Sequence, residues 1–65
     1  IVTITGRREV LIENYKGILE YTGEYIKIQT KNAKLTVYGK KLSIEYYTNE
    51  DMKVVGFVKS IEYEA

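Results

Sequence analysis

Four glycines divide the chain into units of nearly equal length. Gly6, Gly23, Gly39 and Gly56 follow one another at intervals of 17, 16 and 17 residues. Apolar residues stand four and two positions before each of these glycines and five positions after it. A period that carries the same apolar pattern four times is an internal repeat, so each unit is expected to form the same piece of structure.

The pattern within each unit predicts β-strands. Apolar and polar residues alternate on both sides of the glycine, as they do in half-buried strands, and no long stretch has the period of a helix. The alternation changes parity at the glycine, which requires an extra residue at a bulge or bend. We therefore predict an all-β protein, a single small domain over residues 1–65, built as an antiparallel meander of four long strands kinked at Gly6, Gly23, Gly39 and Gly56. The alternative is a short β-solenoid of 16–17-residue coils with the glycines at its corners.

Three polar segments favour the meander over the solenoid. The sequences "NYKG" (14–17), "TKNAK" (30–34) and "TNEDM" (48–52) resemble hairpin turns. Hairpins closed at these segments would place apolar residues opposite one another. The expected pairs include Ile28 with Leu35, Ile26 with Val37, and Ile44 with Met52.

Some apolar side chains fall on the face of the meander opposite its predicted core. Exposed apolar residues that cluster on one face mark a contact with another protein. A chain this short buries only about 60% of its unfolded surface, and without Cys or His it has no disulfide and no thiolate or imidazole metal site. We therefore expect a homo-oligomer or a bound partner. The predicted interface residues are Val10, Ile12, Ile18 and Tyr38.

The sequence contains no catalytic, cofactor-binding or metal-binding constellation, so an enzyme is not expected. No His is present to activate a Ser or Thr, and there is no glycine-rich phosphate loop. Ten Lys and Arg against nine Asp and Glu give a formal net charge of +1, which argues against nucleic acid as the partner. A small nucleic-acid-binding β-fold is the alternative function. The basic pairs in "GRR" (6–8) and "GKK" (39–41) are expected to pair with Glu24.

Four blocks in the chain resemble a known family. The segment "REVLIENYKGILEY" (8–21), the charged strand that follows it, "LTVYGKKLSI" (35–44) and "VVGFVKSIEY" (54–63) have the order and spacing of the YabP/YqfC family of small sporulation proteins from endospore-forming bacteria. The segment "IENYKGIL" (12–19) is most similar to the YqfC branch.

The resemblance implies a setting and gives no catalytic residues. It implies a non-enzymatic protein made in the mother cell during sporulation. From the free edges of the predicted sheet we expect a structural or adaptor protein that works through protein–protein contacts in the cytoplasm of that cell. The partner would be a sporulation membrane protein of the YqfD kind or a second copy of the chain. Membrane association would then come through that partner and not through direct insertion, since the longest apolar run is far shorter than the ~20 residues of a spanning helix.

Overall fold

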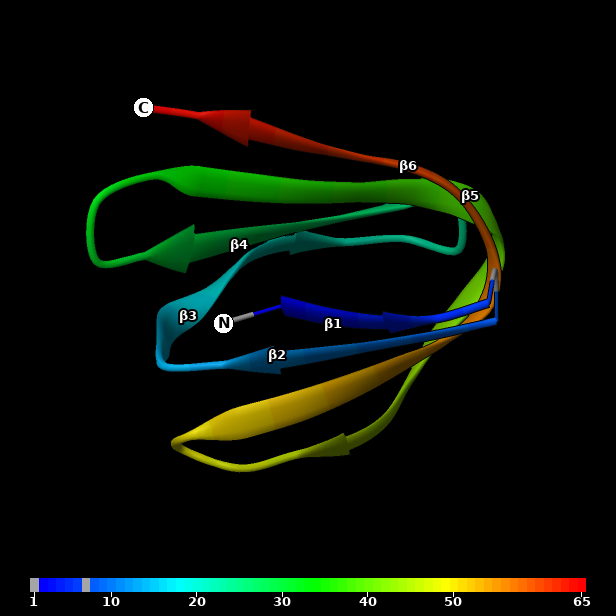
Figure 1. Ribbon diagram of the computed structural model, residues 1–65, viewed down its shortest axis with the longest axis horizontal. Coiled ribbons are helices and arrows are strands. Elements are labelled where there is room, and N and C mark those ends of the chain that lie inside the picture. The colour runs from blue at the N-terminus through cyan, green and yellow to red at the C-terminus, as the bar shows by residue number, and fades with distance from the viewer. Residues whose placement is uncertain (1, 7) are drawn as a thin grey trace.

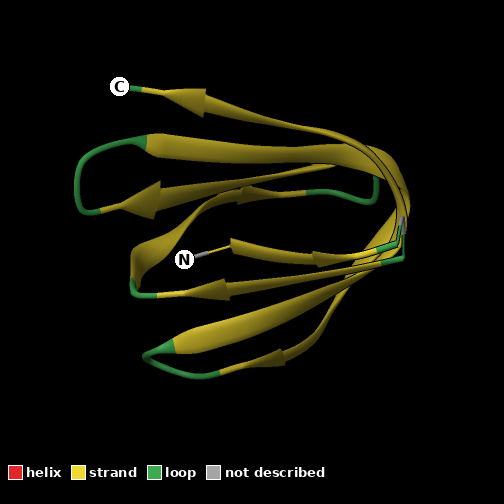
Figure 2. Ribbon diagram, viewed as in Figure 1, coloured by secondary structure: helices red, strands yellow, loops and turns green. Residues whose placement is uncertain are grey.

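The computed structural model of the protein describes residues 2–6 and 8–65, which form six strands (Figures 1 and 2). All six join one sheet in the order β1-β2-β6-β5-β4-β3, and every neighbouring pair is antiparallel. The all-β, antiparallel prediction is confirmed, and the solenoid alternative is wrong. Within residues 2–6 and 8–65, no helix is long and apolar enough to cross a membrane. The strands are β1 (Val2–Thr5), β2 (Glu9–Glu13), β3 (Tyr15–Tyr21), β4 (Tyr25–Thr30), β5 (Lys34–Tyr47) and β6 (Asp51–Glu64).

The structure has six strands where the repeat predicted four, because the chain reverses direction at two of the four glycines. Gly6 lies in the turn between β1 and β2 with a φ of 61°, a left-handed conformation that glycine adopts without steric cost. Gly23 lies in the turn between β3 and β4. There the Thr22 hydroxyl accepts hydrogen bonds from the backbone N–H groups of Glu24 and Tyr25, at 3.1 and 3.0 Å. Each of the first two repeat units is therefore a hairpin.

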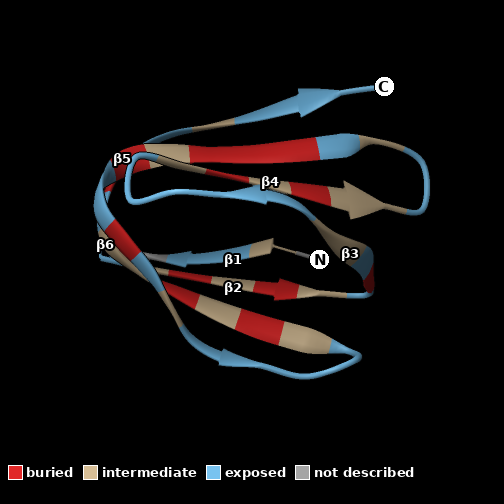
Figure 3. Ribbon diagram, turned by 180° about the vertical axis from the view of Figure 1, so that it is seen from behind, coloured by how far each residue is buried: buried red, intermediate tan, exposed pale blue. Residues whose placement is uncertain are grey.

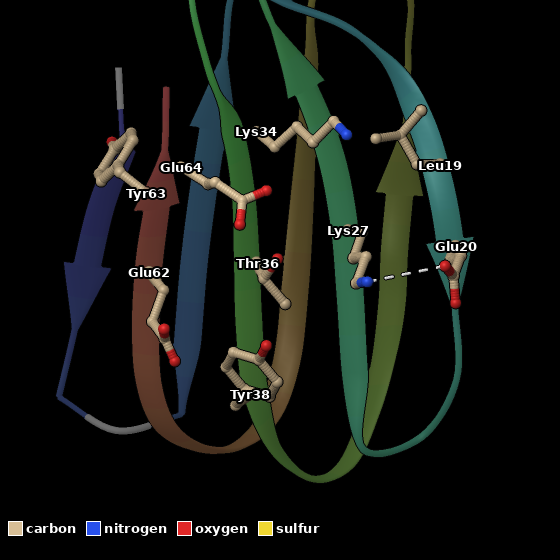
Figure 4. A pocket seen from close by; sticks show the side chains of 9 residues that line it. All are labelled: Leu19, Glu20, Lys27, Lys34, Thr36, Tyr38, Glu62, Tyr63 and Glu64. Carbon is tan, nitrogen blue, oxygen red and sulfur yellow. Dashed lines mark ion pairs between the residues drawn. The ribbon is translucent and has the colours of Figure 1, made fainter.

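The other two glycines lie inside the two longest strands. β5 and β6 contain 14 residues each, and they curve together so that the sheet folds over on itself (Figure 1). One layer contains β3, β4, the first half of β5 and the second half of β6. The other layer contains β1, β2, the first half of β6 and the second half of β5 (Figure 4). The register between β5 and β6 shifts at the bend, between Tyr38 and Gly39 and again between Lys40 and Ser43.

Close contact between β5 and β6 at the bend requires glycine. A Cβ atom on Gly39 would lie 1.9 Å from the carbonyl oxygen of Phe57, and one on Gly56 would lie 2.5 Å from the carbonyl oxygen of Lys41. Gly56 also has a φ of 134°, which L side chains rarely adopt. These two glycines let the strands stay paired while both change layer.

Asn14 carries the chain from one layer to the other between β2 and β3. Its φ of 60° is left-handed, which asparagine tolerates better than most residues. Its backbone N–H donates a hydrogen bond to the Glu50 carbonyl, at 2.9 Å. The hairpin predicted at residues 14–17 is therefore wrong, because β2 pairs with β6 and β3 pairs with β4.

The core lies between the two layers (Figure 3). The predicted pairs of Ile28 with Leu35 and Ile26 with Val37 are confirmed. Ile44 lies opposite Val54 and not opposite Met52, so that register is wrong by two residues. The buried apolar residues are Val10, Ile12, Tyr15, Ile26, Ile28, Leu35, Val37, Leu42, Met52, Val54 and Val58.

Two of the four predicted interface residues belong to this core. Val10 and Ile12 are fully buried, so their predicted exposure is wrong. The reason is the hairpin turn at Gly6: it places Val10 opposite Val54 and Ile12 opposite Met52 on the inner face of the sheet. Ile18 is partly buried and packs against the core, and Tyr38 is half-buried with its ring 6.4 Å from that of Tyr25.

The bend makes a test of the contact between β5 and β6. We expect Gly39→Ala to lower the free energy of unfolding by at least about 1–3 kcal/mol, because the new methyl group must displace the Phe57 backbone. Gly17→Ala is the matched control, since its Cβ would meet nothing within 4 Å. Urea unfolding of both variants measures the difference. Equal stability of the two variants would contradict the close contact at Gly39.

Candidate interaction surface

The folded sheet has two sides where an edge of one layer faces an edge of the other. On one side, β3 faces the second half of β5. On the other side, β1 faces the second half of β6 (Figure 4). These sides are where a two-layer sheet either closes on itself or remains open to another molecule.

Tyrosines close the side formed by β3 and β5. The Tyr21 hydroxyl accepts a hydrogen bond from the Ile44 backbone N–H at 3.1 Å, which joins the two layers directly. The Tyr15 ring lies 5.7 Å from the ring of Tyr47, centroid to centroid. We call this the closed side, and define it by Tyr15, Tyr21, Ile44 and Tyr47.

Tyr15 also ties this side to the turn between β5 and β6. Its hydroxyl donates to the carbonyl oxygen of Thr48 and approaches that of Asp51 at 3.3 Å. Burial raises the pKa of this phenol, and the neighbouring Tyr47 and Asp51 raise it further. The neutral phenol is therefore the form that the folded state stabilises.

The side formed by β1 and β6 has no such closure. Within the part of the chain that the structure describes, no hydrogen bond joins β1 to residues 57–64 of β6. Four apolar side chains lie there on the inner face, because each stands opposite a fully buried residue of the neighbouring strand. We call this the open side, and define it by Val2, Ile4, Ile61 and Tyr63.

The open side leaves apolar surface in contact with water. Ile4 is 53% exposed although it stands opposite buried Val10, and Tyr63 is 64% exposed although it stands opposite buried Leu35. Figure 4 shows Tyr63 extending from β6 to the side on which β1 lies. Inward-facing apolar residues that remain uncovered are typical of a binding site for another chain.

A second candidate surface is a shallow groove on the outer face of the layer that contains β3 and β4. It has a volume of about 260 Å³, and Thr36 forms its floor with 9% of its surface exposed (Figure 4). Lys27 pairs with Glu20 at 3.7 Å on one wall. The groove offers mixed charges to a polar ligand. It is lined by Leu19, Glu20, Lys27, Lys34, Thr36, Tyr38, Glu62, Tyr63 and Glu64.

The outer face of the other layer carries a surface ion-pair network. The Lys53 ammonium lies 3.2 Å from the Glu45 carboxylate and 3.4 Å from that of Glu9. Hydrogen bonds to Glu45 and Glu9 raise the pKa of Lys53, so it stays charged between the two carboxylates. Among residues 2–6 and 8–65, no group of three or more acidic side chains is placed to hold a metal ion.

The basic segments near the bend do not pair with Glu24 as expected. Arg7 lies outside the described residues. Arg8 lies over the ring of Phe57, 4.6 Å from its centroid, on the opposite side of the bend from the turn that holds Glu24. Glu24 forms no ion pair with any described residue; its carbonyl oxygen accepts a hydrogen bond from Gly39. The expected charge pairing is therefore wrong for the part of the chain that the structure describes.

The closed side makes a test of the Tyr15 hydroxyl. We expect Tyr15→Phe to lower the free energy of unfolding near neutral pH by about 1 kcal/mol through the lost hydrogen bonds. Because the folded-state pKa of Tyr15 is raised above its ordinary value of 10.0, the hydroxyl stabilises the fold fully below about pH 10. This contribution is lost as the pH rises through the folded-state pKa, so the difference between wild type and variant should shrink in alkali.

Tyr46→Phe is the control for this measurement. Tyr46 is 42% exposed, and its hydroxyl forms no hydrogen bond with the described residues. Chemical unfolding at several pH values between neutrality and alkali should leave Tyr46→Phe close to wild type throughout. A Tyr15→Phe deficit that does not change with pH would contradict the role given to burial of the phenol.

Two comparisons with known proteins bear on the family of this chain. The YqfC protein of Bacillus subtilis (strain 168) is 24% identical to the chain over 62 residues, which cover 95% of this chain and 67% of that protein. The model of the YabP family matches residues 1–65, which is the whole chain. The protein therefore belongs to the YabP family.

Proposed function

We propose that this protein is a non-enzymatic structural or adaptor protein of sporulation that acts through protein–protein contacts. Membership of the YabP family supports the setting. The exposure of Ile4 and Tyr63 on the inner face of the sheet supports the mode of action. This single observation carries the proposal, because a small domain gains stability from every apolar side chain it covers.

The open side replaces the interface predicted from the sequence. The sequence analysis predicted a contact that includes Val10 and Ile12, but both side chains are buried in the core. The partner in this proposal is a sporulation membrane protein of the YqfD kind or a second copy of the chain. The adaptor works in the cytoplasm of the mother cell and reaches the membrane through its partner.

A nucleic-acid-binding module is the second candidate, because one patch has the right chemistry for stacking bases. Phe57 is 48% exposed, Arg8 lies over its ring, and Lys40 stands opposite it in the neighbouring strand. The net charge of +1 disfavours this function, since neutralising phosphates requires a strongly basic surface. Retention on heparin that falls steeply with salt would favour the second candidate over the first.

The adaptor proposal predicts that a charge on the open side abolishes partner binding. In a pull-down from the membrane fraction of sporulating cells, we expect the tagged Ile4→Asp variant to retain about one tenth as much partner as the tagged wild type, or less. A tenfold loss of affinity corresponds to ~1.4 kcal/mol of binding free energy. Thr3→Asp introduces the same charge on the same strand, but Thr3 faces outward, opposite Leu11. Thr3→Asp should bind like wild type, and melting curves should show both variants folded. Equal retention by all three proteins would contradict the proposal.

A further inference from the structure

The second half of β6, residues 57–64, has one free backbone edge. Its other edge pairs with β5, where Ile61 stands opposite Val37 and Tyr63 opposite Leu35. No strand among residues 2–6 and 8–65 pairs with the free edge of this half. A free edge presents unpaired N–H and C=O groups, and a strand of another chain can complete their hydrogen bonds.

The remaining free edges are less suited to strand addition. β1 has only four residues, and β3 shifts register twice along its length. In the second half of β5, the N–H of Ile44 already donates to Tyr21. From Ser60 to Glu64, by contrast, β6 keeps a regular register with β5. This stretch offers the most regular edge for an added strand.

The side chains along this stretch alternate between apolar and acidic. Ile61 and Tyr63 stand opposite inward-facing residues of β5, whereas Glu62 and Glu64 face outward. Tyr63 lies at the edge of the sheet and also lines the outer groove with the two glutamates (Figure 4). Glu62 and Glu64 form no ion pair with any described residue. An added strand would therefore meet apolar surface on its inner side and, on its outer side, the carboxylates of Glu62 and Glu64, of which only Glu64 has a lysine, Lys34, opposite it on β5.

We infer that the free edge of β6 binds an extended segment of a partner protein in which apolar residues alternate with lysine or arginine. The apolar side chains would cover Ile4 and Tyr63, and the cations would stand beside Glu62 and Glu64 in the enlarged sheet. An acidic segment is rejected by like-charge repulsion at the same positions. This inference rests on the proposed adaptor function and specifies the chemistry of its partner.

A second copy of the chain fits this edge less well. If two copies paired antiparallel about the centre of the regular stretch, Glu62 would stand opposite Glu62 of the other copy. Like charges directly opposite one another destabilise a pair of strands. The charges on β6 therefore favour a basic strand of another protein over the same β6 segment of a second copy.

Synthetic peptides test the inference directly. The probes are a seven-residue peptide of alternating valine and lysine and its counterpart of alternating valine and glutamate. We expect the lysine peptide to bind wild-type protein at least about tenfold more tightly, as measured by calorimetry. It should slow amide exchange within residues 60–64, and N-methylation of its alternate amides should abolish binding, because strand pairing needs those donors.

Charge reversal on the protein provides the matched control. The double variant Glu62→Lys/Glu64→Lys should prefer the glutamate peptide, because both sites remain on the free edge and only their sign changes. Binding without this reversal, or without protection of residues 60–64, would overturn the inference. Self-association of the free protein that Tyr63→Asp abolishes would also overturn it, by making a second copy the occupant. In either case, loss of partner with Ile4→Asp in cell extracts would still support the adaptor function.

Discussion

The contact between β5 and β6 at their shared bend is the constraint on which the rest of the structure depends. Gly39 lies against the carbonyl of Phe57, and Gly56 lies against that of Lys41, with no room for a side chain at either position. Because the two strands stay paired through the bend, both contribute to both layers. One pair of strands thus joins the layers, and the hairpins β1–β2 and β3–β4 extend one layer each.

This arrangement leaves the two sides of the folded sheet unequal. Aromatic residues at one side span the gap, since Tyr21 bonds across it to Ile44 and Tyr15 packs on Tyr47. On the other side, Tyr63 is 64% exposed and its hydroxyl forms no hydrogen bond with the described residues. The difference is one of side-chain chemistry at equivalent places in the two layers. It gives the first side a hydrogen bond and a ring contact across the gap, although Tyr21 and Tyr47 are themselves 50% and 53% exposed.

The sequence predicted the strand content and the pairing of β4 with β5, because alternation and a short polar turn are both local signals. It did not distinguish a glycine in a turn from a glycine in a bend. At Gly6 the chain reverses, and at Gly39 it continues, yet both stand in the same apolar pattern. What separates them is the approach of Phe57 to Gly39, a contact between residues distant in sequence.

The uncertainty between a turn and a bend at Gly6 also explains why two of the predicted interface residues were wrong. If the strand had continued through Gly6, Leu11 would face the core and Ile12 would face outward. The hairpin turn keeps the parity instead, so Val2, Ile4, Val10 and Ile12 share the inner face and Leu11 is only partly covered. The open side was missed for a related reason. Ile4 and Tyr63 alternate with polar residues as core residues do, and they are exposed because no described strand pairs with the outer edge of β1 or of the second half of β6.

Exposure on the open side has a cost that a chain of 65 residues does not easily compensate. Fully burying an isoleucine side chain is worth about 1.5–3 kcal/mol relative to leaving it in water. A substantial part of that stabilisation is absent at Ile4, which is 53% exposed. A partner strand on the edge of β6 would recover it and would complete the backbone hydrogen bonds at the same time. The feature that limits the stability of the isolated domain is therefore the feature that would favour binding under the adaptor function that we propose.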